Sequence, residues 1–317
     1  MNATHADVII VGGGIAGLSA AIYLGRAKRE TLVIDKGKSM ARWEPDVQNY
    51  LGFPDGIAGD ELLRRARWQA RRYRVKFVRD EIVSAHPRGR NFWLRGGKDN
   101  YTCGRLLLAT GIFHVPPSIP GVKPCLGHSM FFCKDCDGYR VQNRRIAIYG
   151  WTNETAEYAL AMLAYSRRVM IVTDGRKPRW SRRHEKWIRA SRIPVHRKTI
   201  RDVRHSCGQI QSLAFNGEPD LQIEGLFTTR GDIYFSHLAK NLGAKLSRAG
   251  DIVVGLDMRT TVKGLYAAGC VTPANCQMII AAGQGAAAAQ AINRNLFEES
   301  LAKLTLKVWR KTARQPK

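Results

Sequence analysis

Two thiols and a carboxyl lie close together in the middle of the chain, in FFCKDCDGY at residues 131–139. Cys133 and Cys136 are separated by two residues, and Asp137 follows the second cysteine directly. Two thiols at this spacing can close a small disulfide ring, and a turn that leads into a helix favours the thiolate of the first one. The pattern therefore predicts a redox-active pair of cysteines.

Zinc is the alternative ligand for such a pair. A structural zinc site needs four ligands, and these usually include a second closely spaced pair. The remaining cysteines are scattered along the chain: Cys103, Cys125, Cys207, Cys270 and Cys276. We expect no metal site, and we favour the redox pair over zinc or over cysteines without a chemical role.

A nucleotide-binding pattern opens the chain, in DVIIVGGGIAGLSAAIYL at residues 7–24. An apolar strand is followed by Gly12, Gly14 and Gly17 at the dinucleotide spacing. The first glycine permits a tight turn, the second lets the backbone approach a pyrophosphate, and the third lets helix and strand pack closely. The next strand, TLVID, ends at Asp35, where a carboxylate can accept a hydrogen bond from a ribose hydroxyl.

Length and composition fit an α/β protein with two domains. The chain has 317 residues and 44% apolar content, enough to bury two cores. No cleavage site of small residues precedes the first strand, so we expect no signal peptide. The apolar stretch 278–292 is too short to cross a bilayer and is interpreted as a packed helix. Seven cysteines, an odd number, indicate a reducing compartment, and we expect a cytoplasmic protein.

Four motifs together give the sequence a resemblance to the low-molecular-weight thioredoxin reductases over nearly its whole length. Besides CxxCDG, these are NYLGFPDGIAGDELLRRARWQA at 49–70, LLLATGIFHVPPSIPG at 106–121, and TTVKGLYAAGCV with QMIIAAGQGAAAAQAI at 260–292. The resemblance implies two Rossmann-like nucleotide-binding domains, with the FAD domain split by insertion of the CxxC domain. The expected bounds are 1–116 and 249–317 for the FAD domain and 117–248 for the inserted one. The crossovers are expected at Ile119–Gly121 and at Ala249–Gly250.

The resemblance also implies a role for single residues. Cys136 would face the flavin, Cys133 would exchange with an external dithiol or disulfide, and Asp137 would move the proton. The glycine fingerprint and Asp35 would hold the adenosine half of FAD. The positions expected along the rest of the cofactor are Thr110, Gly111, Gly269, Cys270 and Gln277. At Cys270 the family usually has aspartate, so one polar contact to the cofactor is lost.

The second domain has a nucleotide pattern with its glycines partly replaced, in IAIYGWTNETAEYAL at 146–160. The expected turn consists of Gly150, Trp151, Thr152, Asn153, Glu154 and Thr155. A β-branched side chain at Thr152 obstructs the close approach of a pyrophosphate. The following strand ends in Thr173, Asp174 and Gly175, where an NADPH-dependent enzyme would have arginines for the 2′-phosphate. Asp174 would repel that phosphate and could instead bind a ribose hydroxyl.

Three interpretations of this second site compete. In the first, the site is vestigial and binds no nucleotide. In the second, it binds a nicotinamide cofactor weakly or in an altered pose. In the third, it binds a different dinucleotide whose ribose contacts Asp174. We favour the third, with a second FAD as the candidate, because the sequence resembles the diflavin-linked disulfide oxidoreductases within the same family.

The charge is strongly positive, with 51 basic and 26 acidic residues and a net charge of +25. Such a field attracts polyanions, but no nucleic-acid-binding motif accompanies it, so we expect no nucleic-acid partner. Acidic redox proteins and anionic membrane surfaces fit better. The C-terminal stretch 296–317 predicts a basic amphipathic helix with Phe297, Leu301, Leu304 and Val308 on one face. That face either lies peripherally on a membrane or packs on the FAD domain or a second subunit, and we expect a homodimer.

The main functional hypothesis is a flavin-dependent disulfide oxidoreductase. It passes two electrons between FAD and the Cys133/Cys136 pair, and onward to or from a dithiol or disulfide protein or a small thiol. The alternatives are a thioredoxin reductase that depends on NAD(P)H or ferredoxin, and a non-enzymatic flavin redox sensor. The residues do not specify the direction of electron flow.

Overall fold

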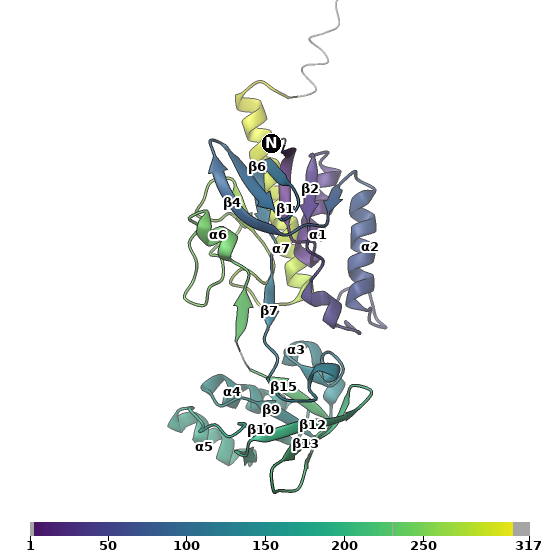
Figure 1. The fold of residues 1–317 in the computed structure, drawn as a ribbon, viewed down its shortest axis with the longest axis vertical. Coiled ribbons are helices and arrows are strands. Elements are labelled where there is room, and N and C mark those ends of the chain that lie inside the picture. Colours follow the sequence, from purple (N-terminus) through teal and green to yellow (C-terminus); the bar gives the residue numbers. More distant parts are fainter. Residues whose placement is uncertain (1–2, 230, 307–317) are drawn as a thin grey trace, which may run out of the picture. The chain divides into compact units, whose positions relative to one another are not determined.

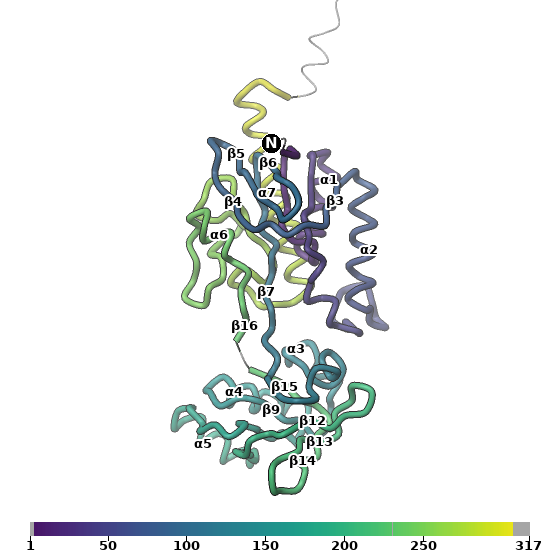
Figure 2. Tube along the Cα trace, in the orientation of Figure 1, coloured from purple at the N-terminus to yellow at the C-terminus, as the bar shows by residue number. Residues whose placement is uncertain are grey.

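The computed structural model describes residues 3–229 and 231–306, and it divides into two compact units (Figures 1 and 2). The first unit comprises Met1–Arg42, Tyr50–Phe113 and Tyr234–Lys317, and the second comprises Trp43–Asn49 and His114–Ile233. The mixed α/β fold with one unit inserted into the other confirms the predicted fold class.

The first unit is built on a sheet in the order β3-β2-β1-β6-β5-β4, with β17 also paired to β6. Its strands are β1 (Thr4–Val11), β2 (Thr31–Ile34), β3 (Lys76–Val78), β4 (Ile82–Arg88), β5 (Asn91–Gly96), β6 (Asn100–Leu108) and β17 (Leu265–Ala267). The strands around β1 are parallel, whereas β4, β5 and β6 pair antiparallel. Both faces of β1 and β2 are covered, which explains their continuous apolar runs.

Helices flank this sheet, with α2 beside α1 in Figure 1. They are α1 (Ile15–Arg26), α2 (Gly59–Arg71), α6 (His237–Asn241), α7 (Met278–Ala302) and the 3-10 turn η1 (Met40–Trp43). Helix α7 packs closely on α1, because a Cβ atom added at Gly285 would lie 2.1 Å from the Ala16 carbonyl oxygen. The apolar stretch 278–292 is therefore the packed helix that the sequence predicts.

The second unit contains a parallel sheet in the order β11-β10-β9-β15-β8 and an antiparallel sheet β12-β13-β14. Its strands are β8 (Met130–Phe131), β9 (Ile146–Tyr149), β10 (Val169–Val172), β11 (Val195–His196), β12 (Ile200–Ser206), β13 (Gln209–Phe215), β14 (Leu221–Gln222) and β15 (Gly225–Thr228). Its helices are α3 (Lys134–Asp137), α4 (Asn153–Met162) and α5 (Arg182–Ala190), with 3-10 turns η2 (Lys123–Cys125) and η3 (Tyr139–Val141).

The two chain crossings between the units pair with each other as a two-stranded sheet of β7 (Ile112–His114) and β16 (Asp232–Tyr234). The return to the first unit therefore comes earlier in the chain than the Ala249–Gly250 turn that the sequence suggested. Leu238 and Ala239 of α6 already belong to the core of the first unit. A turn residue alone does not reveal such packing.

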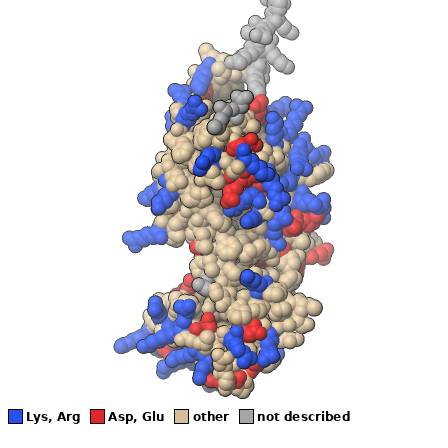
Figure 3. Space-filling model, viewed as in Figure 1, with Lys and Arg blue, Asp and Glu red and all other residues tan. Residues whose placement is uncertain are grey.

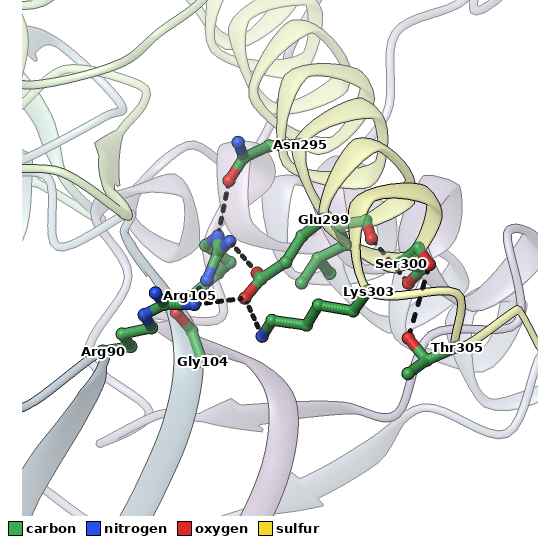
Figure 4. A network of polar contacts seen from close by, with 9 residues as sticks. Arg90, Gly104, Arg105, Asn295, Glu299, Ser300, Lys303 and Thr305 are labelled. Carbon is green, nitrogen blue, oxygen red and sulfur yellow. Dashed lines mark hydrogen bonds and ion pairs between the residues drawn. The ribbon is translucent and has the colours of Figure 1, made fainter.

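A polar network fixes the last turns of α7 to β6 (Figure 4). Arg105 donates from Nε to Asn295 Oδ1 over 2.6 Å and from Nη2 to Glu299 Oε2 over 2.6 Å. Lys303 also donates to Glu299. The hydrogen bonds and charges of Lys303 and Arg105 lower the pKa of Glu299. These contacts therefore stabilise the folded protein at pH values above the unfolded pKa of this carboxyl. Their contribution is lost as the pH falls through the folded pKa.

Basic side chains gather along the edge formed by α2 and at α5 (Figure 3). Some of the α2 arginines are paired locally, because Arg64 and Arg65 both bind Glu61.

The C-terminal part of the described chain has three of the predicted apolar residues at its surface. Phe297, Leu301 and Leu304 are exposed there. The rest of the predicted amphipathic helix, from residue 307 onward, lies outside the described residues. Within the described part of the chain, no helix is long and apolar enough to span a membrane.

Candidate active site

Cys133 and Cys136 are joined as a disulfide, as the redox prediction requires. Helix α3 begins directly after Cys133, which is its N-cap residue. The backbone N–H of Cys136 donates to the Sγ atom of Cys133 over 3.1 Å. A hydrogen bond to a charged sulfur favours the thiolate, so a negative charge on Cys133 is stabilised when the bond opens.

Asp137 ends α3 and is buried, with 4% of its surface exposed. Burial raises the pKa of its carboxyl to about 7, and the nearby Glu44 carboxylate acts in the same direction. The Arg140 guanidinium lowers it and donates from Nη1 to Oδ1 over 3.1 Å. The cost of placing a charge out of water outweighs this single ion pair. A carboxyl with this pKa can both give and take a proton near neutral pH.

Glu44 is a member of this site that the sequence did not indicate. It comes from Trp43–Asn49, a segment that belongs to the second unit although the flanking residues belong to the first. Burial raises the pKa of Glu44, while Arg140 and His114 lower it. The buried Asp137 carboxyl and the partly buried Glu44 carboxyl therefore share the field of one guanidinium, and ionisation of one disfavours ionisation of the other.

Gly138 completes the motif for a steric reason. A Cβ atom at this position would lie 2.5 Å from the carbonyl oxygen of Lys134 and 2.5 Å from Cε2 of Tyr165. The absence of a side chain therefore lets the Tyr165 ring pack directly against the end of α3.

The first nucleotide fingerprint forms the turn between β1 and α1. A Cβ atom at Gly12 would lie 2.2 Å from the Ala109 carbonyl oxygen, and one at Gly17 would lie 2.0 Å from the Gly12 carbonyl oxygen. Packing within the protein therefore requires both glycines. A Cβ atom at Gly14 would meet only Ser39 Oγ, at 3.4 Å. Since the protein leaves room at Gly14, glycine there fits the close approach of a ligand, as a dinucleotide cofactor requires.

Asp35 lies against this turn, because a Cβ atom at Gly13 would be 2.8 Å from its Cγ. Its Oδ2 accepts a hydrogen bond from Arg67 Nη2 over 2.9 Å, a partner that the sequence did not suggest. Thr110 also adjoins the turn, since its backbone nitrogen would lie 3.3 Å from a Cβ atom at Gly12. The Thr110 hydroxyl donates to the carbonyl oxygen of Phe235 over 2.7 Å.

The segment between β17 and α7 also lies against the turn between β1 and α1. A Cβ atom at Gly269 would lie 2.9 Å from Cβ of Ala16, in the first turn of α1. Gln284 holds this segment, because its Oε1 accepts from the Gly269 N–H over 2.8 Å and from Thr272 Oγ1 over 3.1 Å. Gln277 is the N-cap residue of α7. The structure thus assembles Gly12, Gly14, Gly17, Asp35, Thr110, Gly111 and Gly269 around the end of β1.

A second disulfide joins Cys270 to Cys276. In the sequence, Cys270 and Cys276 stand among the scattered cysteines, and the structure corrects that interpretation for this pair. The six-residue separation does not predict a bond, because cysteine pairing depends on the fold. Cys103 and Cys125 are free and buried, and Cys207 is free and exposed.

The turn of the second nucleotide pattern is closed by threonine hydroxyls. Thr155 Oγ1 accepts from the Thr152 N–H over 3.2 Å and contacts Thr229 Oγ1 at 2.8 Å. A Cβ atom at Gly150 would lie 2.2 Å from this same Oγ1 atom. A backbone N–H that could face a phosphate is therefore engaged within the protein.

Asp174 is also engaged within the protein. Its Oδ2 accepts from the Tyr149 hydroxyl over 3.0 Å, and its Oδ1 accepts from the Ile200 N–H over 2.9 Å. The sequence pattern did not indicate Arg176, whose guanidinium lies 4.2 Å from the centroid of the Trp151 ring. A cation therefore does stand beside this turn, although no arginine follows β10 directly.

The two flanking turn residues differ in their surroundings. Asn153 Oδ1 accepts from the Ser181 N–H over 2.7 Å, which ties the start of α4 to α5. The pKa of Glu154 is raised by partial burial and by the Asp232 and Glu157 carboxylates. Neither side chain offers a cationic contact to a phosphate.

Comparison with known proteins places this geometry in a family. The family model of the pyridine nucleotide-disulphide oxidoreductases matches residues 6–291. A thioredoxin reductase from Treponema pallidum (strain Nichols) is 30% identical over 297 residues, covering 91% of this chain and 96% of the relative. The chain belongs to the pyridine nucleotide-disulphide oxidoreductase family.

Two solved structures illustrate the range of similarity. The crystal structure of HlmI matches with a TM-score of 0.90 at 25% identity, covering 98% of this chain and 100% of that one. The atypical thioredoxin reductase TRi from Desulfovibrio vulgaris Hildenborough matches with a TM-score of 0.53 at 29% identity, covering 93% and 99%. The protein is thus a thioredoxin reductase-like flavoprotein, an FAD-dependent disulfide oxidoreductase.

Proposed function

We propose that the Cys133/Cys136 disulfide exchanges two electrons with one bound FAD on one side and with an external dithiol or disulfide on the other. The closed disulfide followed at once by a buried carboxyl with a pKa of about 7 carries this proposal. A redox pair needs a proton donor and acceptor that works at neutral pH, and Asp137 meets that need.

The thiol chemistry follows from the contacts of the pair. An external thiolate attacks Cys133 Sγ, the S–S bond breaks, and Cys136 leaves as a thiolate with the electron pair. The second external thiol then attacks the mixed disulfide and releases Cys133, whose charge the Cys136 N–H stabilises. Arg140 donates to Asp137 Oδ1, so the exchangeable proton sits on Oδ2. The reverse sequence reduces an external disulfide.

The residues around β1 would hold FAD. Gly12, Gly14 and Gly17 would admit the pyrophosphate, Asp35 would accept from a ribose hydroxyl, and Gly269 with Gln277 would lie along the remainder. When bound, FAD supplies the two-electron acceptor and donor for the disulfide. Packing within the protein does not require a glycine at position 14, which supports this assignment.

The partner is proposed to be a thioredoxin-like dithiol or disulfide protein, because the Treponema pallidum relative is a thioredoxin reductase. The exposed basic side chains on α2 and α5 favour a partner with an acidic face. We also propose that the protein associates with an anionic membrane surface, forms a homodimer and is located in the cytoplasm.

NADPH is expected to be a poor donor. The Thr152 N–H and both oxygens of Asp174 are engaged within the protein. Each lost charge-assisted phosphate contact costs about 1.5–3 kcal/mol, so two would weaken binding by roughly a hundredfold or more. In anaerobic stopped-flow experiments, dithiothreitol should reduce the flavin quickly and with saturation, whereas NADPH should reduce it slowly and without saturation.

The matched variant for this test is Thr152→Gly, which removes an exposed branched side chain from the turn and should improve reduction by NADPH. Arginine at Asp174 is unsuitable, because it would break the contacts to Tyr149 and Ile200. Rapid, saturable reduction of the unmodified protein by NADPH would contradict this proposal and would indicate an ordinary NADPH-dependent reductase.

The occupant of the second nucleotide site is tested by flavin stoichiometry. We propose a second FAD there, since the strand and the helix of the nucleotide-binding fold are retained as β9 and α4. Denaturing the purified protein and measuring the released flavin should give two FAD per chain. One FAD per chain would show that the second-FAD prediction is wrong and that the site is vestigial or serves another ligand.

A further inference from the structure

The Cys270–Cys276 disulfide lies in the first unit, in a short segment without regular secondary structure between β17 and α7. Both cysteines are partly exposed, and Pro273 and Asn275 within the loop are exposed. By contrast, the free thiol of Cys103 in the same unit is completely buried. Opening this disulfide therefore does not require the core to unfold.

The loop does not depend on the disulfide for its shape. Thr272 donates from its backbone N–H to the Gly269 carbonyl oxygen over 2.9 Å and from Oγ1 to the same oxygen over 2.8 Å. Gln284 Oε1 accepts from both Gly269 and Thr272. A disulfide that closes so short a loop removes little freedom from the unfolded chain. The S–S bond can open while these hydrogen bonds keep the backbone in place.

The two sulfurs are chemically unequal. Cys276 directly precedes Gln277, the N-cap residue of the 25-residue helix α7, and no acidic side chain lies in the first turn of that helix. The positive end of a helix dipole stabilises a thiolate, and the more stable thiolate is the better leaving group in disulfide exchange. An attacking thiolate should therefore bond to Cys270 Sγ and expel Cys276.

From this geometry we propose that Cys270–Cys276 is a second redox-active disulfide, which thiols reduce independently of the Cys133/Cys136 pair. A thiolate attacks Cys270 Sγ, the S–S bond breaks, and its electron pair leaves on Cys276 Sγ. A second thiolate attacks the external sulfur of the mixed disulfide, this second S–S bond breaks, and Cys270 leaves with the electron pair of that bond. The two external thiols become one disulfide, and Cys270 and Cys276 gain two electrons and, after protonation, two protons.

The test uses the full-length flavoprotein with Cys133→Ser and Cys136→Ser, so that the first pair can neither react nor relay electrons. The protein is equilibrated anaerobically in buffers with different ratios of reduced to oxidised glutathione, and is then alkylated in the native state. Mass spectrometry of the peptide that holds Cys270 and Cys276 counts the labels. Cys103 and Cys125, which are buried, report any unfolding because they remain unlabelled in the folded protein.

The expected result is a rise from zero to two labels on that peptide as the buffer becomes more reducing, with return to zero in oxidised glutathione. A structural disulfide resists the glutathione pool. A pair that stays unlabelled in reduced glutathione until Cys103 is also labelled would overturn the proposal. The proposal would also be overturned if Cys270 and Cys276 were found as two free thiols that oxidised glutathione does not convert to a disulfide.

A further variant tests which sulfur is attacked. Adding Cys276→Ser to the same background removes the resolving thiol, so oxidised glutathione should leave a stable mixed disulfide on Cys270. If the variant protein is soluble and folded but this adduct is absent, the role assigned to Cys270 is contradicted. Because both experiments lack the first pair, their outcomes are independent of the function proposed for Cys133 and Cys136.

Discussion

Replacing Cys136 by serine should leave FAD bound while slowing the reduction of the flavin by dithiols by roughly a thousandfold or more. The substitution removes one sulfur of the Cys133–Cys136 bond, so no disulfide remains at α3 to carry two electrons. Serine has nearly the same size as cysteine, so the fold should persist. Stopped-flow absorbance of the bound flavin, mixed anaerobically with dithiothreitol, measures the rate.

Cys207→Ser is the matched control, because Cys207 is a free and exposed cysteine of the same unit and has no place in the proposed site. It should react like the unmodified protein. If the Cys136 variant were reduced as fast as this control, the flavin would receive electrons by a route that does not involve the CxxC pair. A non-enzymatic redox sensor would instead show one round of reduction in the unmodified protein and no sustained turnover with a dithiol.

Asp137→Asn should lower the rate of exchange by about a hundredfold to ten-thousandfold, the usual range for the loss of a general acid and base. Asparagine preserves the shape of the side chain but cannot carry a proton between a thiol and solvent. In the unmodified protein the rate should change with pH around 7, because burial raises the pKa of Asp137 to that value. The variant should lose this dependence.

The stability of the protein offers a second readout for Asp137. Its folded pKa of about 7 lies above the value near 3.9 of an unfolded aspartate, so the native state prefers the protonated form. The protonated Asp137 carboxyl makes its full contribution to the free energy of unfolding below the unfolded pKa. That contribution is lost as the pH rises through the folded pKa. The thermal midpoint of Asp137→Asn should therefore rise relative to the unmodified protein between pH 4 and roughly 7.

Asp135→Asn is the control for both measurements, since Asp135 lies in the same helix but is exposed and paired with Lys134. It should leave the pH dependence unchanged. If the Asn variant at position 137 kept both the full rate and its dependence on pH, another group would be the proton carrier. Glu44 is the first candidate, because burial also raises its pKa.

The sequence predicted those features that depend on local pattern. The apolar run before Gly12 and the glycine spacing after it specify a buried strand, a tight turn and a helix, and the structure has all three. The CxxC spacing likewise predicted the Cys133–Cys136 bond, because two residues between the thiols bring the sulfurs together within a single turn. In each case the residues that matter are neighbours in the chain.

Features that depend on distant segments could not be predicted. Glu44 joins the site of Asp137 only because Trp43–Asn49 belongs to the second unit. Asp174 was expected to face a ribose, but Tyr149 and Ile200 bind both of its oxygens. The Cys270–Cys276 bond requires the chain to fold back before α7. None of these contacts leaves a periodic or spaced signal in the sequence.

The contact between Gly138 and Tyr165 limits how the redox motif could be moved to another scaffold. The six residues CxxCDG contain both thiols and the carboxyl, so they look sufficient for transplantation. The end of α3, however, packs against an aromatic ring that the chain supplies only after α4, at the point where Gly138 has no side chain. A host protein that does not pack around the end of α3 and bury Asp137 in the same way would leave this carboxyl in water, and its pKa would fall toward that of an ordinary aspartate. Such a graft would keep the disulfide and lose the proton carrier.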